Sequence, residues 1–515
     1  MQAKAVLSKI FYAAFFCAFA IVVGKVLFFD SIHTYNPLVL LLCLIPAVGL
    51  IVLSHSLLTK RRAAIERHYR AILIGFLSLY GLLILVNGFL LRFTPSFDMD
   101  AIYGGAVQWI EDGSFSNYYE YYGYFPNNLG AMTVLHFVFS LAARAGVTDF
   151  FAVGIVFNSA LLTATAMVTS LTCRKLRGSV AGVMALVLFS LCLPFWFMGA
   201  AFYTDSLSVL FPILFYDLYL LFKEQATWRG RLLAAGGMAA ALTIGMLIKF
   251  TVVIVLVAVV IDALLCIDWK RVCLFAGCCG LLAAASFGAM NAYLYSAHLD
   301  KAACEELKTP YLHWVMMGLQ NSGQYHPEDY VYTRSYPPEA RKQACLARIE
   351  ERVQALGPLG LTQLFTDKAA VCFGDGTYAL SDFLDDAPAN DTKLHQYLLY
   401  DGAHHRAYQY LTTGILLAVY LLMLLGAAKC LRKKAGSPAL SELAPRLASL
   451  GILSFLLLWE TSGRYFTNFV PLMLVCAVLS LVGEENNAAC FATKHLQQYG
   501  PTKNQSHFSV GNSTI

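Results

Sequence analysis

Residues 71–106 read AILIGFLSLYGLLILVNGFLLRFTPSFDMDAIYGGA, an apolar run over 71–92 followed by a turn and two closely spaced aspartates. A run of this length crosses a hydrocarbon core of about 30 Å as a helix, because lipid offers the backbone no hydrogen-bond partners and a helix satisfies its own. The stretch therefore predicts a membrane-spanning helix that leads directly into a polar loop with carboxylates at its start.

The composition of the whole chain extends this prediction. Its 515 residues are 58% hydrophobic and only 13% charged, about half the 25% of a typical soluble domain. Recurrent continuous apolar runs exclude a soluble globular protein, a disordered chain and a disulfide scaffold, and they differ from the short alternating strands of a β-barrel. We predict an all-α polytopic membrane protein with about 12 transmembrane helices, at 9–29, 37–58, 71–92, 150–173, 178–199, 206–222, 232–248, 251–267, 272–295, 408–428, 445–460 and 465–483.

Basic residues cluster in five of the connections between these runs, all of which fall on one face of the membrane. The positive-inside rule makes that face cytoplasmic, with both termini on the same side of a multi-pass plasma-membrane protein. This orientation requires that the apolar residues 126–145 form an interfacial or re-entrant helix on the outer leaflet rather than a span. The clusters are Lys60, Arg61, Arg62, Arg67 and Arg70; Arg174, Lys175 and Arg177; Lys223, Arg229 and Arg231; Lys270 and Arg271; and Lys429, Arg432, Lys433 and Lys434.

Two sizeable segments then lie outside the cytoplasm, and the chemistry is expected there. The segment at 296–407 is a long loop or lid that holds 15 of the 32 acidic residues, and of its three cysteines (Cys304, Cys345 and Cys372) one pair can form a disulfide although none is required. The predicted organisation is N-terminal transmembrane helices at 1–92, a first catalytic external loop with juxtamembrane helices at 93–149, a transmembrane core at 150–295, the long external loop at 296–407, C-terminal transmembrane helices at 408–484 and a cytoplasmic tail at 485–515.

The first external loop carries the candidate base. Asp98 and Asp100 lie close to the membrane exit, where a carboxylate has a raised pKa or a cationic partner and suits proton abstraction from an acceptor hydroxyl. The alternative is that Asp100 caps a helix over 101–111 and Asp98 is solvated. The tyrosines that follow suit stacking on sugars, or equally an interfacial aromatic belt.

Further charged residues are expected on the same face. Asp205 is a second candidate acid, or else the N-cap of the sixth helix. Lys249 marks the turn between spans seven and eight, as a snorkelling residue or as a partner for an anionic headgroup. Arg464 interrupts an apolar run and its planar donor fork suits a phosphate, with Glu460 and Tyr465 beside it; the alternative is a plain Glu460–Arg464 ion pair.

Carboxylates, phosphate-binding cations and aromatic rings on one face suit an enzyme whose donor is a lipid-linked phosphosugar. A carboxylate would deprotonate the acceptor, and the cations would stabilise the leaving phosphate. No cofactor is required, a divalent metal is optional because no clean ligand set is visible, and no nucleic-acid partner is expected. Acceptor or sugar contacts are predicted at Tyr103, Tyr124, Asn127, His313, Trp314, Lys368 and Asp375.

Four motifs make the chain resemble GT-C-type integral membrane glycosyltransferases, in the group of the protein O-mannosyltransferases and aminoarabinose transferases, and especially their Gram-positive-style bacterial members. They are FDMDAIYGGA followed by YFPNNLG, the TD at Asp205, the KFT turn at Lys249, and GRYF with Pro471 after it. The chain departs from the adjacent Asp-Glu pair of the O-mannosyltransferases, because Met99 separates its two acids.

The resemblance implies a GT-C fold, a polyprenyl-phosphate sugar donor, an external active site and an inverting transfer of a hexose to a cell-envelope polymer or glycolipid. It also implies that Asp98 or Asp100 is the loop acid, Asp205 the second acid and Arg464 the phosphate contact. A lipid-linked saccharide flippase or transporter is the alternative, and it predicts functional charges near the bilayer midplane. A non-catalytic membrane scaffold is a third reading.

Overall fold

The computed structural model describes residues 2–385, 387–433 and 442–483. Over these ranges the regular secondary structure consists of helices and one isolated antiparallel bridge between Phe93 and Pro388. The prediction of an all-α protein is confirmed for these ranges. The predicted tail at 485–515, and Lys434 in the last basic cluster, lie outside the described residues.

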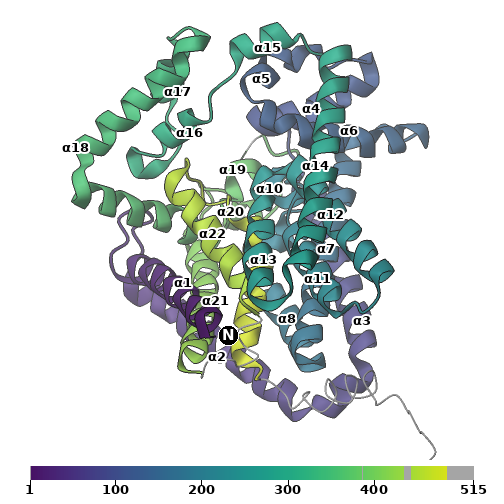
Figure 1. Cartoon of the computed structure of the whole chain (residues 1–515), viewed down its shortest axis with the longest axis vertical. Coiled ribbons are helices and arrows are strands. Elements are labelled where there is room, and N and C mark those ends of the chain that lie inside the picture. The colour runs from purple at the N-terminus through teal and green to yellow at the C-terminus, as the bar shows by residue number, and fades with distance from the viewer. Residues whose placement is uncertain (1, 386, 434–441, 484–515) are drawn as a thin grey trace, which may run out of the picture.

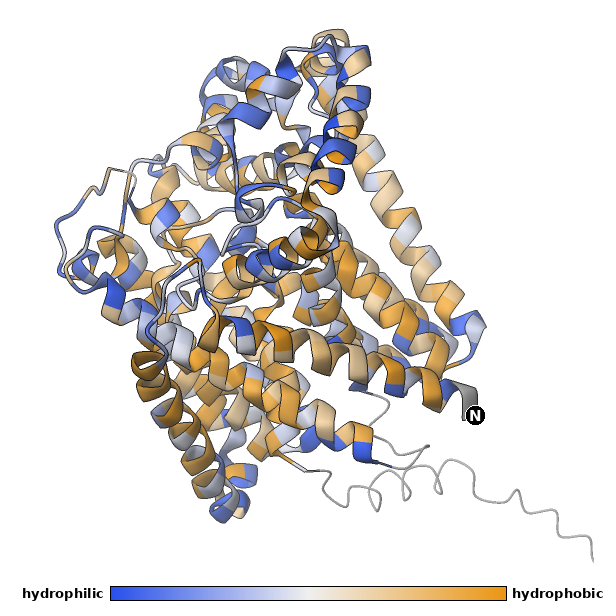
Figure 2. Cartoon of the chain, turned by 90° about the vertical axis from the view of Figure 1, so that its left-hand side faces the viewer, coloured by the Kyte–Doolittle hydropathy of each residue, from blue (hydrophilic) through white to orange (hydrophobic). Residues whose placement is uncertain are grey.

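Within the described ranges, eight helices are long and apolar enough to cross a membrane. Figure 1 shows how the helices are arranged. In Figure 2 hydrophobic residues dominate the long helices, whereas hydrophilic residues gather toward the upper end of the molecule. These candidate spans are Lys4–Phe28 in α1 (Gln2–Phe28), α2 (Pro37–Lys60), α3 (Arg62–Leu90), α7 (Phe150–Arg177), Thr204–Glu224 across α10 (Thr204–Leu207) and α11 (Leu210–Glu224), α12 (Trp228–Ile248), α14 (Trp269–Ala297) and α21 (His405–Arg432).

The other four predicted spans correspond to apolar helices that are shorter than a full crossing. A straight helix of 13 to 17 residues rises only about 20–25 Å, so length alone supports eight spans and the predicted count of about 12 is not confirmed. The shorter helices are α8 (Ser179–Leu191), η3 with α13 (Phe250–Cys266), α22 (Ala444–Leu458), and η6 with α23 (Thr467–Leu481).

The segment at 93–149, which was predicted to be the first external loop, folds into helices that lie across one end of the bundle (Figure 1). Within it α6 packs on α4 and against α12 and α7, and α6 is not among the eight candidate spans. The apolar residues 126–145 therefore hold no helix as long as those eight spans, and their place on the outer leaflet stays a prediction. The helices are α4 (Phe97–Asp112), η1 (Ser116–Tyr118), α5 (Tyr119–Tyr124), η2 (Pro126–Asn128) and α6 (Leu129–Arg144).

The long loop forms a helical cover on the same end of the molecule (Figure 1). Its longest helix, α18, bends at Gly357 and Pro358, and its second half is tied to α1 by an ion pair between Asp367 and Lys25 with an N–O distance of 2.6 Å. The helices are α15 (Lys301–Leu307), α16 (Leu312–Met317), η4 (Asn321–Gly323), α17 (Pro327–Arg334), α18 (Pro338–Phe373), α19 (Ser381–Leu384) and α20 (His395–Leu398).

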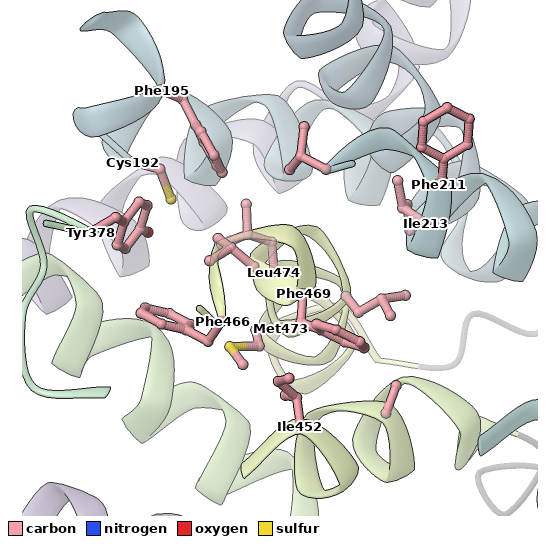
Figure 3. Packing of buried hydrophobic residues seen from close by; sticks show 14 of the residues in the cluster. Cys192, Phe195, Phe211, Ile213, Tyr378, Ile452, Phe466, Phe469, Met473 and Leu474 are labelled. Atoms are coloured by element: carbon pink, nitrogen blue, oxygen red, sulfur yellow. The ribbon is translucent and has the colours of Figure 1, made fainter. Parts of the chain in front are cut away.

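The hydrophobic core lies directly beneath the GRYF motif. Figure 3 shows Phe466, Phe469 and Met473 packed among side chains from other helices, and the ring of Phe466 lies 4.9 Å from that of Phe373 and 5.3 Å from that of Tyr378. Because Phe466 is fully buried, it fixes the backbone of the two preceding residues, Arg464 and Tyr465.

The YFPNNLG motif depends on a glycine contact. A Cβ atom at Gly130 would overlap the backbone carbonyl of Leu247 at the end of α12, so the small residue lets α6 approach the turn that carries Lys249. We predict that Gly130→Ala lowers the free energy of unfolding by about 1–3 kcal/mol. The measurement is thermal unfolding in detergent micelles.

Gly236, within α12, is the matched control, since nothing lies within 4 Å of a Cβ added there. Gly236→Ala should stabilise the protein by about 0.5–1 kcal/mol, because alanine has the higher helix propensity. Equal effects of the two substitutions would contradict the close-approach argument.

Candidate active site

A cleft of about 110 Å³ opens at the end of the bundle that carries the external-loop helices. It is formed by the start of α4, by Tyr203 just before α10, by part of α19 and by Arg464. The segment before α4 pairs with the segment after α19, since the amide of Ala389 donates to the carbonyl of Arg92 at 2.8 Å. This pairing brings α4 and α19 together. The cleft is lined by Ser96, Phe97, Asp98, Met99, Tyr203, Asp382, Phe383 and Arg464.

Asp98 faces this cleft with its carboxylate held by two tyrosines. The hydroxyl of Tyr121 donates to Oδ1 at 2.8 Å, and that of Tyr203 donates to Oδ2 at 3.2 Å. The Asn128 amide in turn donates to the Tyr121 oxygen at 2.5 Å. Each carboxylate oxygen keeps accepting capacity after one such bond, so Asp98 is oriented and still able to take a proton.

Asp100 points away from Asp98. Residues two apart on a helix lie about 200° apart around its axis, and Asp100 accepts instead from the hydroxyl of Tyr118 at 3.2 Å. Burial raises the pKa of Asp100. The N-cap of α4 is Ser96 and the helix begins at Phe97, so Asp100 lies within the first turn rather than at the cap of a helix over 101–111.

Asp205 joins two cations that are far apart in sequence. Its Oδ2 accepts from Nη1 of Arg464 at 3.0 Å, and its Oδ1 is bonded to Nζ of Lys249. Asp205 is 2% exposed. The N-cap of α10 is Tyr203, so Asp205 does not cap this helix, which was the alternative prediction for it. With both oxygens engaged by cations, Asp205 is placed to orient them rather than to accept a proton.

Aromatic rings and one more carboxylate surround this cluster. The Arg464 guanidinium lies over Tyr203 at 5.1 Å and over Phe383 at 5.4 Å from the ring centroids. Glu460, in the connection after α22, accepts from the hydroxyl of Tyr465 at 2.7 Å, and burial raises the pKa of Glu460 to about 7. Arg464 therefore pairs with Asp205, whereas Glu460 binds the tyrosine that follows the arginine.

Three predicted contacts of the long loop have partners within the loop or at Trp459, outside the cleft lining. Lys368 is fully buried and donates to the carbonyls of Gly318 (2.7 Å) and Trp459 (2.8 Å), and burial lowers its pKa to about 8. Nδ1 of His313 lies 2.7 Å from Oγ1 of Thr333, and burial lowers the pKa of His313 to about 4. The ring of Trp314 stacks on that of Trp459 at 6.5 Å.

The other four predicted contacts also have partners outside the cleft lining. Tyr103 packs in an aromatic cluster 5.5 Å from the ring of Phe151, and the ring of Tyr124 lies beneath the guanidinium of Arg334. Asn127 donates to its neighbour Asn128 at 3.0 Å. Asp375 accepts from the amide and hydroxyl of Thr377 at 3.0 and 2.7 Å, which makes it part of the GDGTY turn.

The cleft also contains residues that the sequence analysis did not select. Tyr203 lies two positions before Asp205, and its hydroxyl bond to Asp98 links the two candidate acids. Asp382 lies just after the GDGTY turn and lines the cleft with Phe383. Both residues lie close in sequence to motifs that were selected, Tyr203 to the TD motif and Asp382 to the GDGTY turn. This proximity was the signal that could have identified them.

The cysteines of the long loop have no disulfide: Cys304, Cys345 and Cys372 are free thiols. Across the ranges that the structure describes, no group of three or more His, Cys, Asp or Glu side chains is placed to hold a metal ion.

Comparison with known proteins gives a family and a similar solved structure. A family model described as "Conserved hypothetical integral membrane protein" matches residues 2–484. None of the curated proteins compared matches this chain. Among solved structures, the chain is similar to ArnT from Cupriavidus metallidurans in a crystal structure bound to undecaprenyl phosphate, with 13% identity, 82% of this chain and 80% of that chain covered, and a TM-score of 0.35.

Proposed function

The chain belongs to the family of conserved hypothetical integral membrane proteins, and we propose that this member is a GT-C-type glycosyltransferase. It moves a sugar from a polyprenyl-phosphate donor to a cell-envelope acceptor on the extracytoplasmic face of the plasma membrane. One observation carries the proposal: a carboxylate with free accepting capacity, Asp98, and a guanidinium, Arg464, line one cleft.

Asp98 is the proposed general base. The acceptor hydroxyl gives its proton to the carboxylate while its oxygen forms a bond to the anomeric carbon of the donor. The bond from that carbon to the phosphate oxygen breaks at the same time, and the polyprenyl phosphate leaves with the electron pair, so the configuration inverts. The hydrogen bonds from Tyr121 and Tyr203 hold the base in one orientation, as general-base catalysis requires.

Arg464 is the proposed phosphate contact. Only one of its five N–H donors is needed for the bond to Asp205, and the rest suit phosphate oxygens. Lys249, Arg464 and Asp205 together carry two positive charges and one negative, a net charge of +1 in a poorly solvated place. That charge attracts the donor phosphodiester and stabilises the charge that develops as the phosphate leaves, so the proposal needs no metal.

The proposal is tested by incubating purified protein with a panel of radiolabelled polyprenyl-phosphate sugars. We expect one of them to be bound and consumed when an acceptor is present. A protein that binds none of the donors, in conditions where it is folded, would refute the proposal.

Glu460 gives the donor affinity a dependence on pH. Because burial raises its pKa to about 7, Glu460 is mainly protonated at about pH 6 and mainly ionised at about pH 8. Ionisation adds a negative charge near Arg464 and Lys249, which are among the groups that interact with Glu460 electrostatically. We therefore predict that the Kd of the donor, measured without acceptor, rises about two- to tenfold from about pH 6 to about pH 8.

The control for this prediction is Glu460→Gln, which stays neutral at both pH values. Its donor Kd should remain at the low value measured for the wild type at about pH 6. The donor is a phosphodiester and keeps one negative charge throughout this range, so its own ionisation does not contribute. An equal rise in Kd in the variant would assign the pH dependence to another group.

A further inference from the structure

The open end of the cleft contains an aromatic ring that takes no part in the proposed transfer chemistry. Phe97 lines the cleft next to Asp98, yet its side chain is 89% exposed. A phenylalanine contributes to stability by burial, and this one is left in the open at the entrance. Its place therefore calls for an explanation other than packing.

The backbone at Phe97 is also in an unusual conformation. Its φ is +47°, in the left-handed region that L-residues other than Gly, Asn and Asp rarely adopt. The chain holds this conformation from both sides: the bridge between Phe93 and Pro388 lies before it, and the first turn of α4, with the Asp100 amide donating to the Ser96 carbonyl at 3.1 Å, lies after it. Strained residues kept in place by their surroundings concentrate at ligand sites.

A second carboxylate, that of Asp382, lines the same cleft from α19. The hydroxyl of Tyr400 donates to its Oδ1 at 2.5 Å, which fixes its orientation and leaves Oδ2 to accept from a ligand. Asp98 and Asp382 together put two carboxylates in one lining. Once Arg464 is engaged by the donor phosphate, the two carboxylates leave this lining negatively charged, so it repels a polyanionic acceptor and accepts hydrogen bonds from hydroxyl groups.

We propose that Phe97 and Asp382 form the acceptor subsite and that the acceptor is an uncharged saccharide. The C–H face of one sugar ring packs on the ring of Phe97, a second hydroxyl donates to Asp382, and the hydroxyl to be glycosylated points at Asp98. This inference rests on the proposed glycosyl transfer and narrows it. It excludes a phosphate-rich polymer, which the two carboxylates repel, and a peptide, which offers no sugar face to the ring of Phe97.

The experiment compares three kinds of acceptor with one donor: a series of neutral oligosaccharides, a glycerol-phosphate polymer and a Ser/Thr-rich peptide. Wild type should transfer to a saccharide and not to the other two. Phe97→Asn removes the ring and introduces a residue that tolerates the left-handed backbone conformation. The melting temperature of this variant should therefore equal or exceed that of the wild type. Its KM for the saccharide should nevertheless rise about 10- to 100-fold, with the donor Kd unchanged.

Two further variants and a control complete the test. Phe97→Trp keeps an aromatic face and should retain most of the saccharide affinity, whereas Asp382→Asn should raise the saccharide KM about 5- to 20-fold. Phe137→Ala removes another exposed phenylalanine, 63% exposed on α6 and outside the cleft lining, and should change neither KM nor donor Kd.

The results separate this inference from the proposed function. An unchanged saccharide KM in Phe97→Asn, a preference for the polymer or the peptide, or no transfer to any saccharide by a protein that binds donor would overturn the acceptor subsite alone. Failure of the wild type to bind any donor would overturn the proposed function and the subsite together.

Discussion

Asp98→Asn is expected to lower kcat for sugar transfer by about 10²- to 10⁴-fold, the range over which a positioned general base contributes. The amide has nearly the shape of the carboxylate but does not take the proton of the acceptor hydroxyl. Because the phosphate is bound by Arg464 and not by Asp98, the donor Kd should stay within about threefold of the wild-type value. The measurement is transfer of labelled sugar at saturating donor, together with donor binding in the absence of acceptor.

Asp100→Asn is the matched control, since it makes the same chemical change two residues further along the same helix. Asp100 faces Tyr118 and does not line the cleft, so we expect kcat to remain within a few-fold of the wild type. If the two variants lost kcat to a similar extent, transfer would depend on the integrity of α4 and not on the Asp98 carboxylate. Full activity in Asp98→Asn would remove the proposed base.

This contrast between Asp98 and Asp100 shows where sequence patterns stop being informative. Both aspartates follow the same apolar run, and the spacing of two left the choice between them open. The choice depends on where α4 begins, which is set by Ser96 and by the pairing of the chain before it with residues near Pro388. That pairing joins segments almost 300 residues apart, and no local pattern reports it.

The helices were easier to predict from the sequence than the site, because the length of an apolar run is a local property. Each of the twelve predicted apolar runs contains a helix in the structure. Only helix length departed from expectation: the run at 178–199 includes α8, which ends at Leu191 and is followed by the separate short helix α9 (Pro194–Phe197). Apolar residues continue through that break, so hydropathy alone does not reveal it.

Asp205, Lys249 and Arg464 were expected together on one face, with the two cations at the donor phosphate. The ion pairs that join both cations to Asp205 were not predicted. Arg464 was instead compared with Glu460, its neighbour at helical spacing. Tertiary packing brought Arg464 to a carboxylate 259 residues away, and long-range pairing of this kind leaves no periodic trace in one sequence.

The largest effect on stability is expected from Asp205→Ala. The substitution leaves Lys249 and Arg464 as two poorly solvated cations without the carboxylate that joins them. Removing one partner from a buried ionic group typically costs about 3–5 kcal/mol. We expect a drop of this size in the free energy of unfolding, seen as a lower thermal midpoint in detergent micelles.

The double variant Asp205→Ala, Lys249→Met tests whether the loss comes from the unpaired charges. Removing the lysine charge together with the carboxylate restores a net charge of +1, so at least half of the lost stability should return. Asp149→Asn breaks a solvent-exposed pair with Arg92, whose side chains are 31% and 50% exposed (arginine and aspartate), and it should cost no more than about 1 kcal/mol. If Asp205→Ala were as mild as Asp149→Asn, the carboxylate would not be holding the two cations, and the phosphate site proposed around Arg464 would lose its support.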